Sequence, residues 1–175
     1  DAICRLKVQY GTSFCYPIIS IGAHVSAVPN HQVYRITPIA TRANVAHFGT
    51  FGYELDLNKL TEKEREQVRE QIKFMKEYRE VIQFGDFYRL VSPFESNFTS
   101  WMVVSKDKKT ALVGWYKVLN EINGPYRRVR LEGLNPELVY HVDGDKGHFG
   151  DELMNAGLVV TDSAAGQCQP YEKES

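Results

Sequence analysis

The clearest periodic pattern along the chain lies between residues 61 and 84, where apolar residues recur at helical spacing while charged residues fill the other positions. The apolar face consists of Val68, Ile72, Met75, Tyr78 and Ile82. Thr61 and Glu64 match a capping box, and Gly85 follows the last periodic residue. The pattern predicts a long amphipathic helix that packs by its apolar face and keeps its charged face in solvent.

Shorter patterns precede this helix. Ile3, Leu6 and Tyr10 predict a short helix that ends at Gly11. Residues 12–32 carry almost no charge, so we expect much of this stretch to be buried. Thr37 and Pro38 predict a helix start, with the helix running to about residue 46. The glycines of GTFGYELDLN then predict a bend followed by a short extended segment.

After Gly85 the pattern changes to short segments rich in Val, Tyr, Trp and Leu, separated by turn residues. These segments are 86–91, 100–105, 110–119, 127–133 and 138–143. The second and third predict a hairpin with the charged tip SKDKK. Closely spaced strands of this kind are typical of an antiparallel sandwich. We therefore expect an α+β fold with a domain boundary near residue 86, dividing the chain into 1–85 and 86–175.

Composition argues against several classes of partner. The 21 Lys+Arg and 22 Asp+Glu residues give a formal net charge of -1, so the chain has no overall field for nucleic acid or an anionic membrane. No apolar run approaches the roughly 18 residues of a membrane helix, and the N-terminus lacks the layout of a signal peptide. Cys4, Cys15 and Cys168 are few and odd in number, which favours a reducing compartment and a cytoplasmic location.

The histidines are weak candidates for metal sites. His24 and His31 lie seven positions apart with no carboxylate between them, whereas zinc sites prefer closer spacing and a third ligand. His141 and His148 flank the sequence DGDKG, which supplies fewer oxygen ligands than a calcium loop requires. We interpret both pairs as structural and expect no metal or other cofactor.

Motifs of catalysis and of nucleotide binding do not stand out either. GTSFC lacks the G-x-S-x-G form, and no Lys-Ser/Thr follows Gly49 or Gly52 as in a phosphate loop. Arg128 and Arg130 alternate with apolar residues as on an exposed strand face, which argues against a nucleic-acid site. The residues alone therefore assign no catalytic or substrate-binding side chain.

Two non-catalytic interpretations stay open. A sugar-binding module would use exposed aromatic faces, for which the candidates are Trp101, Trp115, Tyr116 and Tyr126, although all four fit strand core as well. An oligomerisation surface would use the uncharged residues 13–28.

Long ordered blocks of the chain carry a family resemblance. DAICRLKVQYGTSFCYP…GAHVSAVPNHQVYRITPIATRANVAHFGTFGYELDL resembles the end of the catalytic domain of bacterial α-galactosidases of glycoside hydrolase family 36, the melibiases. KEYREVIQFGDFYRLVSPFESNFTSWMVVSKDKKTALVGWY and HFGDELMNAGL resemble the same family's C-terminal domain. The resemblance extends from Asp1 to about Val160.

The resemblance implies a helical tail of a (β/α)8 barrel followed by an antiparallel C-terminal β-sandwich. Residues 1 to about 57 would be the last barrel helix and its surroundings, and the helix from Thr61 would lead into the sandwich. The polar end, TDSAAGQCQPYEKES, suggests that the last strand of the sandwich is missing.

The resemblance also implies retaining hydrolysis of terminal α-galactosides such as melibiose and raffinose by two carboxyl groups about 5 Å apart. The nucleophile would lie on an earlier barrel strand. Asp1 would be the final aspartate of a Ser-Asp-x-x-Asp stretch whose first aspartate is the proton donor, so we expect both catalytic residues to precede this chain. HVSAVPNHQ, residues 24–32, would then be scaffold, and the whole enzyme would be a homo-oligomer.

Relatives commonly carry glycine at the position of Tyr34. If this position needs a positive φ, the tyrosine costs on the order of 1 kcal/mol.

Overall fold

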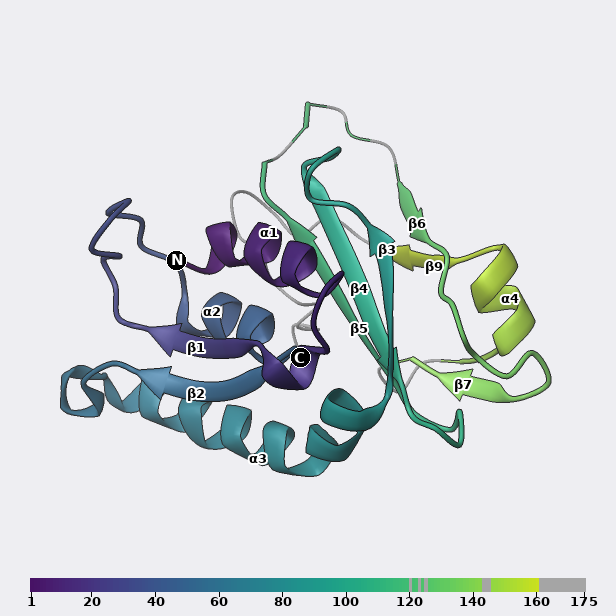
Figure 1. Ribbon diagram of the computed structural model, residues 1–175, viewed down its shortest axis with the longest axis horizontal. Coiled ribbons are helices and arrows are strands. Elements are labelled where there is room, and N and C mark those ends of the chain that lie inside the picture. The colour runs from purple at the N-terminus through teal and green to yellow at the C-terminus, as the bar shows by residue number, and fades with distance from the viewer. Residues whose placement is uncertain (120, 123, 125, 143–145, 161–175) are drawn as a thin grey trace.

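The computed structural model describes residues 1–119, 121–122, 124, 126–142 and 146–160. The first part of the chain alternates helices with strands (Figure 1). Its elements are α1 (Ala2–Thr12), β1 (Gly22–Ser26), α2 (Ile39–Ala46), β2 (Thr50–Glu54) and α3 (Glu62–Phe84), with 3-10 turns at Ile18–Ser20 and Leu57–Lys59. β1 and β2 are parallel, in a register from Gly22↔Thr50 to Ser26↔Glu54. α2 therefore forms the crossover of a β-α-β unit.

The second part consists mostly of antiparallel strands. β3 (Asp86–Val91), β4 (Phe98–Val104) and β5 (Ala111–Lys117) form a three-stranded sheet. β6 (Arg127–Val129) pairs with β9 (Leu158–Val160), and β7 (Val139–His141) pairs with β8 (Gly147–Phe149). The helix α4 (Gly150–Asn155) lies between β8 and β9. The predicted antiparallel hairpin is confirmed as β4 and β5.

The predicted helices are confirmed with small shifts. The capping box of α3 is present, with the Thr61 hydroxyl accepting from the Glu64 backbone and the Glu64 carboxylate accepting from the Thr61 backbone N–H. Ile72 was wrongly placed on the buried face, since it is 37% exposed. Gly85 ends α3 with φ -67, so it is not there for a left-handed turn. A Cβ at this position would lie 2.4 Å from Val81 O and 2.6 Å from Val104 O, and this close approach of backbones is what requires glycine.

Residues 1–57 contain strands as well as helices, since β1 and β2 lie within them. β2 confirms the short extended segment predicted in GTFGYELDLN, whereas β1 was not predicted. β1 is five residues long and includes only two buried apolar side chains, Ala23 and Val25, so its strand signal is weak. Gly49 brings the chain close to β1, since a Cβ there would lie 2.7 Å from the Ala23 Cβ. The expectation that much of residues 12–32 is buried is only partly right, because Ile18, Ile21, Ala23 and Val25 are buried whereas residues 14–16 and 31–32 are exposed.

Helices and sheet share one core. Leu6 of α1, Val45 of α2 and Ile82 of α3 pack in the same cluster as Trp101 and Tyr116 of the β3–β4–β5 sheet. The other face of that sheet packs against a second cluster, which contains Met102, Val104, Val129, Leu131, Leu134 and Leu153. All seven residues of β4 are buried. The sheet is therefore covered on both faces, while its arrangement as a β-sandwich stays a prediction.

Candidate functional site

A small hollow lies at the C-terminal edge of β1, between that strand, the start of α1 and the loop of residues 27–37. We call it the β1-edge hollow. Its lining is Asp1, Ala2, Arg5, His24, Ser26, Ala27, Val28, Asn30, Arg35, Thr37 and Arg42. The N-terminus and the end of β1 lie on the same side of the molecule in Figure 1. The enclosed volume is about 10 Å³, which is room for about one water molecule.

The alternation of strands and helices explains why these residues meet. In a parallel β/α arrangement the strand C-termini and the helix N-termini lie at the same edge, and this is the edge where such folds bind ligands. Ser26 ends β1, Asp1 is the N-cap of α1, and Pro38 is the N-cap of α2. The hollow thus lies at the edge where parallel β/α folds bind ligands.

Asp1 supplies the acidic group of this lining. Its Oδ2 accepts a hydrogen bond from the Cys4 backbone N–H at 3.0 Å and lies 2.5 Å from Arg35 Nη1. The Asp1 side chain is only 5% exposed. Its Oδ1 is buried and makes no hydrogen bond within the described part of the chain.

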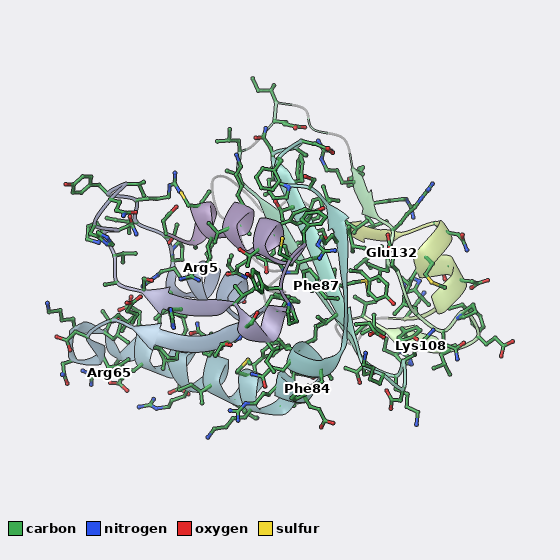
Figure 2. The ribbon with its side chains drawn as sticks, viewed as in Figure 1. Arg5, Arg65, Phe84, Phe87, Lys108 and Glu132 are labelled. Carbon is green, nitrogen blue, oxygen red and sulfur yellow. The ribbon has the colours of Figure 1, made fainter. Side chains whose placement is uncertain are left out.

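Two further guanidinium groups bond to main-chain carbonyls around the hollow. Arg5 Nη1 donates to Gly22 O at 2.6 Å, so this side chain runs from α1 to β1 (Figure 2). Arg42 donates through Nη1 to Ser26 O at 2.6 Å and through Nε to Thr37 O at 3.1 Å. Burial lowers the pKa of Arg5 and of Arg42, while the charges of Glu54 and Glu64 respectively oppose this shift. The side chains that line the hollow thus include three guanidinium groups and one carboxylate, which gives the lining a net positive charge.

The loop of residues 27–37 is organised by Asn30. Asn30 Oδ1 accepts from the backbone N–H groups of Gln32 and Val33 at 3.0 and 3.1 Å. The Asn30 backbone accepts from Tyr34 N at 2.8 Å and donates to Arg35 O at 3.0 Å. Tyr34 has φ 54, so the position does adopt the left-handed conformation that favours glycine.

The predicted histidine pairs are not brought together as metal sites. His24 lines the hollow, and its ring lies close to Gly52, where a Cβ would be 3.3 Å from His24 Cδ2. His31 is exposed in the loop. His148 Nδ1 lies 3.0 Å from Glu152 Oε1. The predicted turn DGDKG cannot be compared in full, because its residues 143–145 lie outside the described residues. Within the described ranges there is no group of three or more His, Cys, Asp or Glu placed to hold a metal ion.

The cysteines, Arg128 and Arg130 lie at the surface where the structure describes them. Cys4 and Cys15 are free and exposed, and Cys168 lies outside the described residues. Arg128 and Arg130 are exposed while Val129 and Leu131 between and beside them are buried, which confirms the predicted alternation.

The aromatic residues proposed for sugar stacking divide into two groups. Trp101 and Tyr116 are buried in the core. Trp115 and Tyr126 line a second hollow of about 290 Å³ together with Val91, Ser96, Phe98, Arg127 and Arg128. Trp115 stacks on Phe98 at a centroid distance of 5.2 Å, and the Arg127 guanidinium lies 3.6 Å from the centroid of the Phe98 ring. Both contacts are made by the Phe98 ring, whereas Tyr126 is 89% exposed.

The β1-edge hollow has room for about one water molecule and does not by itself supply the groups that cleave a glycosidic bond. Retaining hydrolysis needs two carboxyl groups about 5 Å apart, and Asp1 is the one acid among the lining residues. The sequence did not predict that Asp1, Arg5, Arg35 and Arg42 would converge, because they come from two helices and a loop up to 41 positions apart. Only the fold places them together.

Two family models match the chain. The model described as "Melibiase" matches residues 1–85, and the model described as "Glycosyl hydrolase family 36 C-terminal domain" matches residues 98–171. The chain belongs to glycoside hydrolase family 36. It is 52% identical over 160 residues to the α-galactosidase AgaA of Geobacillus stearothermophilus, covering 91% of this chain and 22% of that protein. It is 46% identical over 159 residues to the bifunctional α-galactosidase/sucrose kinase AgaSK of Mediterraneibacter gnavus, covering 90% of this chain and 17% of that protein.

The fold agrees with this family membership. The crystal structure of AgaA superposes with a TM-score of 0.92 at 51% identity, covering 95% of this chain and 23% of that one. The chain thus spans about a fifth of the length of the relatives it matches. Variants of AgaA have been crystallised with raffinose and with stachyose. No helix among the described residues is long and apolar enough to cross a membrane.

Proposed function

We propose that this chain is the C-terminal portion of an α-galactosidase that hydrolyses terminal α-galactosides of the melibiose and raffinose type with retention of configuration. The main support is that the chain superposes on AgaA with a TM-score of 0.92. Its β-α-β unit also has a polar hollow at the C-terminal edge of the strands. The two catalytic aspartates belong to polypeptide that precedes this chain.

The β-α-β unit is part of the catalytic barrel in this proposal. Ala23 and Val25 of β1 are buried against the helices, whereas Gly22 and His24 on the other face are exposed. A parallel sheet is ordinarily covered on both faces, so the exposed face of β1 and β2 is the side that faces the barrel interior. The further strands of that barrel come from the remaining four-fifths of the enzyme.

The boundary between barrel and C-terminal domain lies near residue 86. The two family matches leave a gap between residues 85 and 98, which supports this position. The last strand of the sandwich would be missing because the polar residues 161–175 stand in its place, and these residues lie outside the described ones. The homo-oligomer and the cytoplasmic location of the whole enzyme stay predictions.

The role of this chain is to shape the mouth of the active site. Residues 24–30 contribute five residues to the lining of the β1-edge hollow, so HVSAVPNHQ borders the catalytic edge as well as forming a strand. Arg5 and Arg42 hold the two ends of β1, since they donate to the carbonyls of its first residue, Gly22, and its last residue, Ser26. Substrate held at this edge would meet a preorganised polar surface.

A chimera tests the proposal. These 175 residues would replace the matching region of AgaA, and hydrolysis of p-nitrophenyl α-galactoside and of raffinose would be measured. We expect turnover of both substrates, and a stereochemical product analysis that shows retention. A truncated AgaA that lacks the exchanged C-terminal region is the control for activity of the remaining part. A folded chimera that hydrolyses neither substrate would contradict the proposal.

A further inference from the structure

The ion pair between Asp1 and Arg35 joins the start of α1 to the loop that follows β1. The Asp1 Oδ2 to Arg35 Nη1 distance is 2.5 Å, and the same oxygen caps α1 through the Cys4 N–H. Asp1 is almost fully buried while Arg35 is 42% exposed, so the arginine reaches inward from the loop. A charge pair with one buried partner is screened less than a surface pair, and it is costly to break.

The two ends of this loop are bonded to the fold, at Ala27 through Glu54 O and at Thr37 through Arg42. Val33, Tyr34 and Ile36 all point their side chains into solvent, so the middle of the loop has few apolar contacts. Its internal bonds run through Asn30, whose backbone N–H donates to Arg35 O. Fixing Arg35 therefore also fixes Asn30, which lines the β1-edge hollow.

The second carboxylate oxygen of Asp1 adds an independent observation. Oδ1 is buried and makes no hydrogen bond within the described part of the chain. A buried acceptor without a partner is costly and calls for a donor, which a water, a ligand group or the remaining part of the enzyme would supply. The β1-edge hollow has room for about one water molecule. Asp1 thus binds Arg35 of the loop through Oδ2, while its Oδ1 makes no hydrogen bond within the described residues and the residue lines the hollow.

We propose that Asp1 and Arg35 are positioning residues, which hold the loop of residues 27–37 in the geometry that receives the α-galactoside. This inference rests on the proposed function. Neither side chain performs bond cleavage. Their effect is on binding, because a loop that is already ordered does not lose further conformational entropy when substrate arrives.

The test uses the chimera with AgaA and compares Arg35→Gln, Asp1→Asn and the double variant. We expect each single change to raise KM about tenfold with kcat within about twofold, which corresponds to the loss of about 1.4 kcal/mol in binding. The double variant should be no worse than either single variant, because both remove the same contact. Arg35→Lys should restore part of the affinity.

Arg65→Gln is the matched control, since Arg65 is an exposed residue of α3, away from the hollow (Figure 2), whose ion pair with Glu62 spans 3.8 Å. It should leave KM unchanged. Amide hydrogen exchange of residues 30–37 supplies a second readout, and the Arg35 and Asp1 variants should exchange faster there while α3 exchanges as before.

An active chimera in which Arg35→Gln changes neither KM nor loop exchange would overturn the inference and leave the proposed function standing. Additive losses in the double variant would also count against it. A folded chimera without any activity would instead overturn the proposed function, and this inference with it.

Discussion

His47 should make the stability of the chain depend on pH in a way that one substitution removes. The residue lies at the end of α2 and is 6% exposed. Its ring stacks on Phe51 at 4.6 Å and contacts Phe74 at 4.7 Å between centroids. Its Nδ1 is buried without a hydrogen bond within the described residues. Burial among these rings lowers the pKa of His47 from 6.5 to about 4, so the folded protein holds it neutral.

The sign and size of the effect follow from this shift. Between pH 6.5 and pH 4 the unfolded chain binds a proton at His47 that the folded chain does not, so acid favours unfolding. One pKa unit corresponds to about 1.4 kcal/mol. We expect the free energy of unfolding to fall by about 2 kcal/mol from pH 7 to pH 5 because of His47, and by about 3 kcal/mol from pH 7 to pH 4.

Urea unfolding followed by tryptophan fluorescence at pH 7 and pH 5 measures this loss. His47→Leu removes the titrating group. From pH 7 to pH 5 its free energy of unfolding should fall by about 2 kcal/mol less than that of the unaltered chain. His31→Leu is the control, because His31 is exposed in the loop, and it should leave the loss unchanged. If His47→Leu and the unaltered chain show equal pH dependence of unfolding, burial of neutral His47 is not its cause.

Three further substitutions test the account of the fold, each by urea unfolding at pH 7. Tyr34→Gly should stabilise the chain by about 1 kcal/mol, because it relieves φ 54; Tyr126→Gly, at another exposed aromatic residue, should give no gain. Thr61→Ala should cost about 1 kcal/mol by removing the capping box of α3, and a loss below a few tenths would contradict that role. Trp101→Ala should cost about 3–5 kcal/mol, since the side chain is 1% exposed in the core shared by helices and sheet. A small loss for Trp101→Ala would mean that the two parts do not pack on one another.

Strong local signals made much of the fold predictable. The capping box and the 3.6-residue spacing identified α3, and the alternation of Arg128, Val129 and Arg130 identified an exposed strand face. β1 escaped prediction because its five residues hold only two buried apolar side chains, which is too short a pattern to distinguish from a loop. α4 was missed for a similar reason, since it has only six residues.

The candidate site was less accessible to sequence reasoning. Asp1 and Arg35 are separated by a helix and a strand. Only Asp1 belongs to a site motif, the Ser-Asp-x-x-Asp stretch that the family resemblance implies, and nothing in the sequence around Arg35 marks it as the partner of Asp1. Their convergence follows from the opposite directions of α1 and β1, which place the start of α1 on the same side as the loop after β1 (Figure 1). A residue pair of this kind becomes visible only when the packing of the helix on the strand is known.

If the bond-cleaving carboxyl groups lie outside this chain, the isolated 175 residues do not hydrolyse an α-galactoside. The purified chain would be assayed with p-nitrophenyl α-galactoside beside the chimera at equal concentration. We expect turnover by the chimera and none above background by the chain alone. Turnover by the chain alone that disappears on Asp1→Asn would contradict this placement of the carboxyl groups.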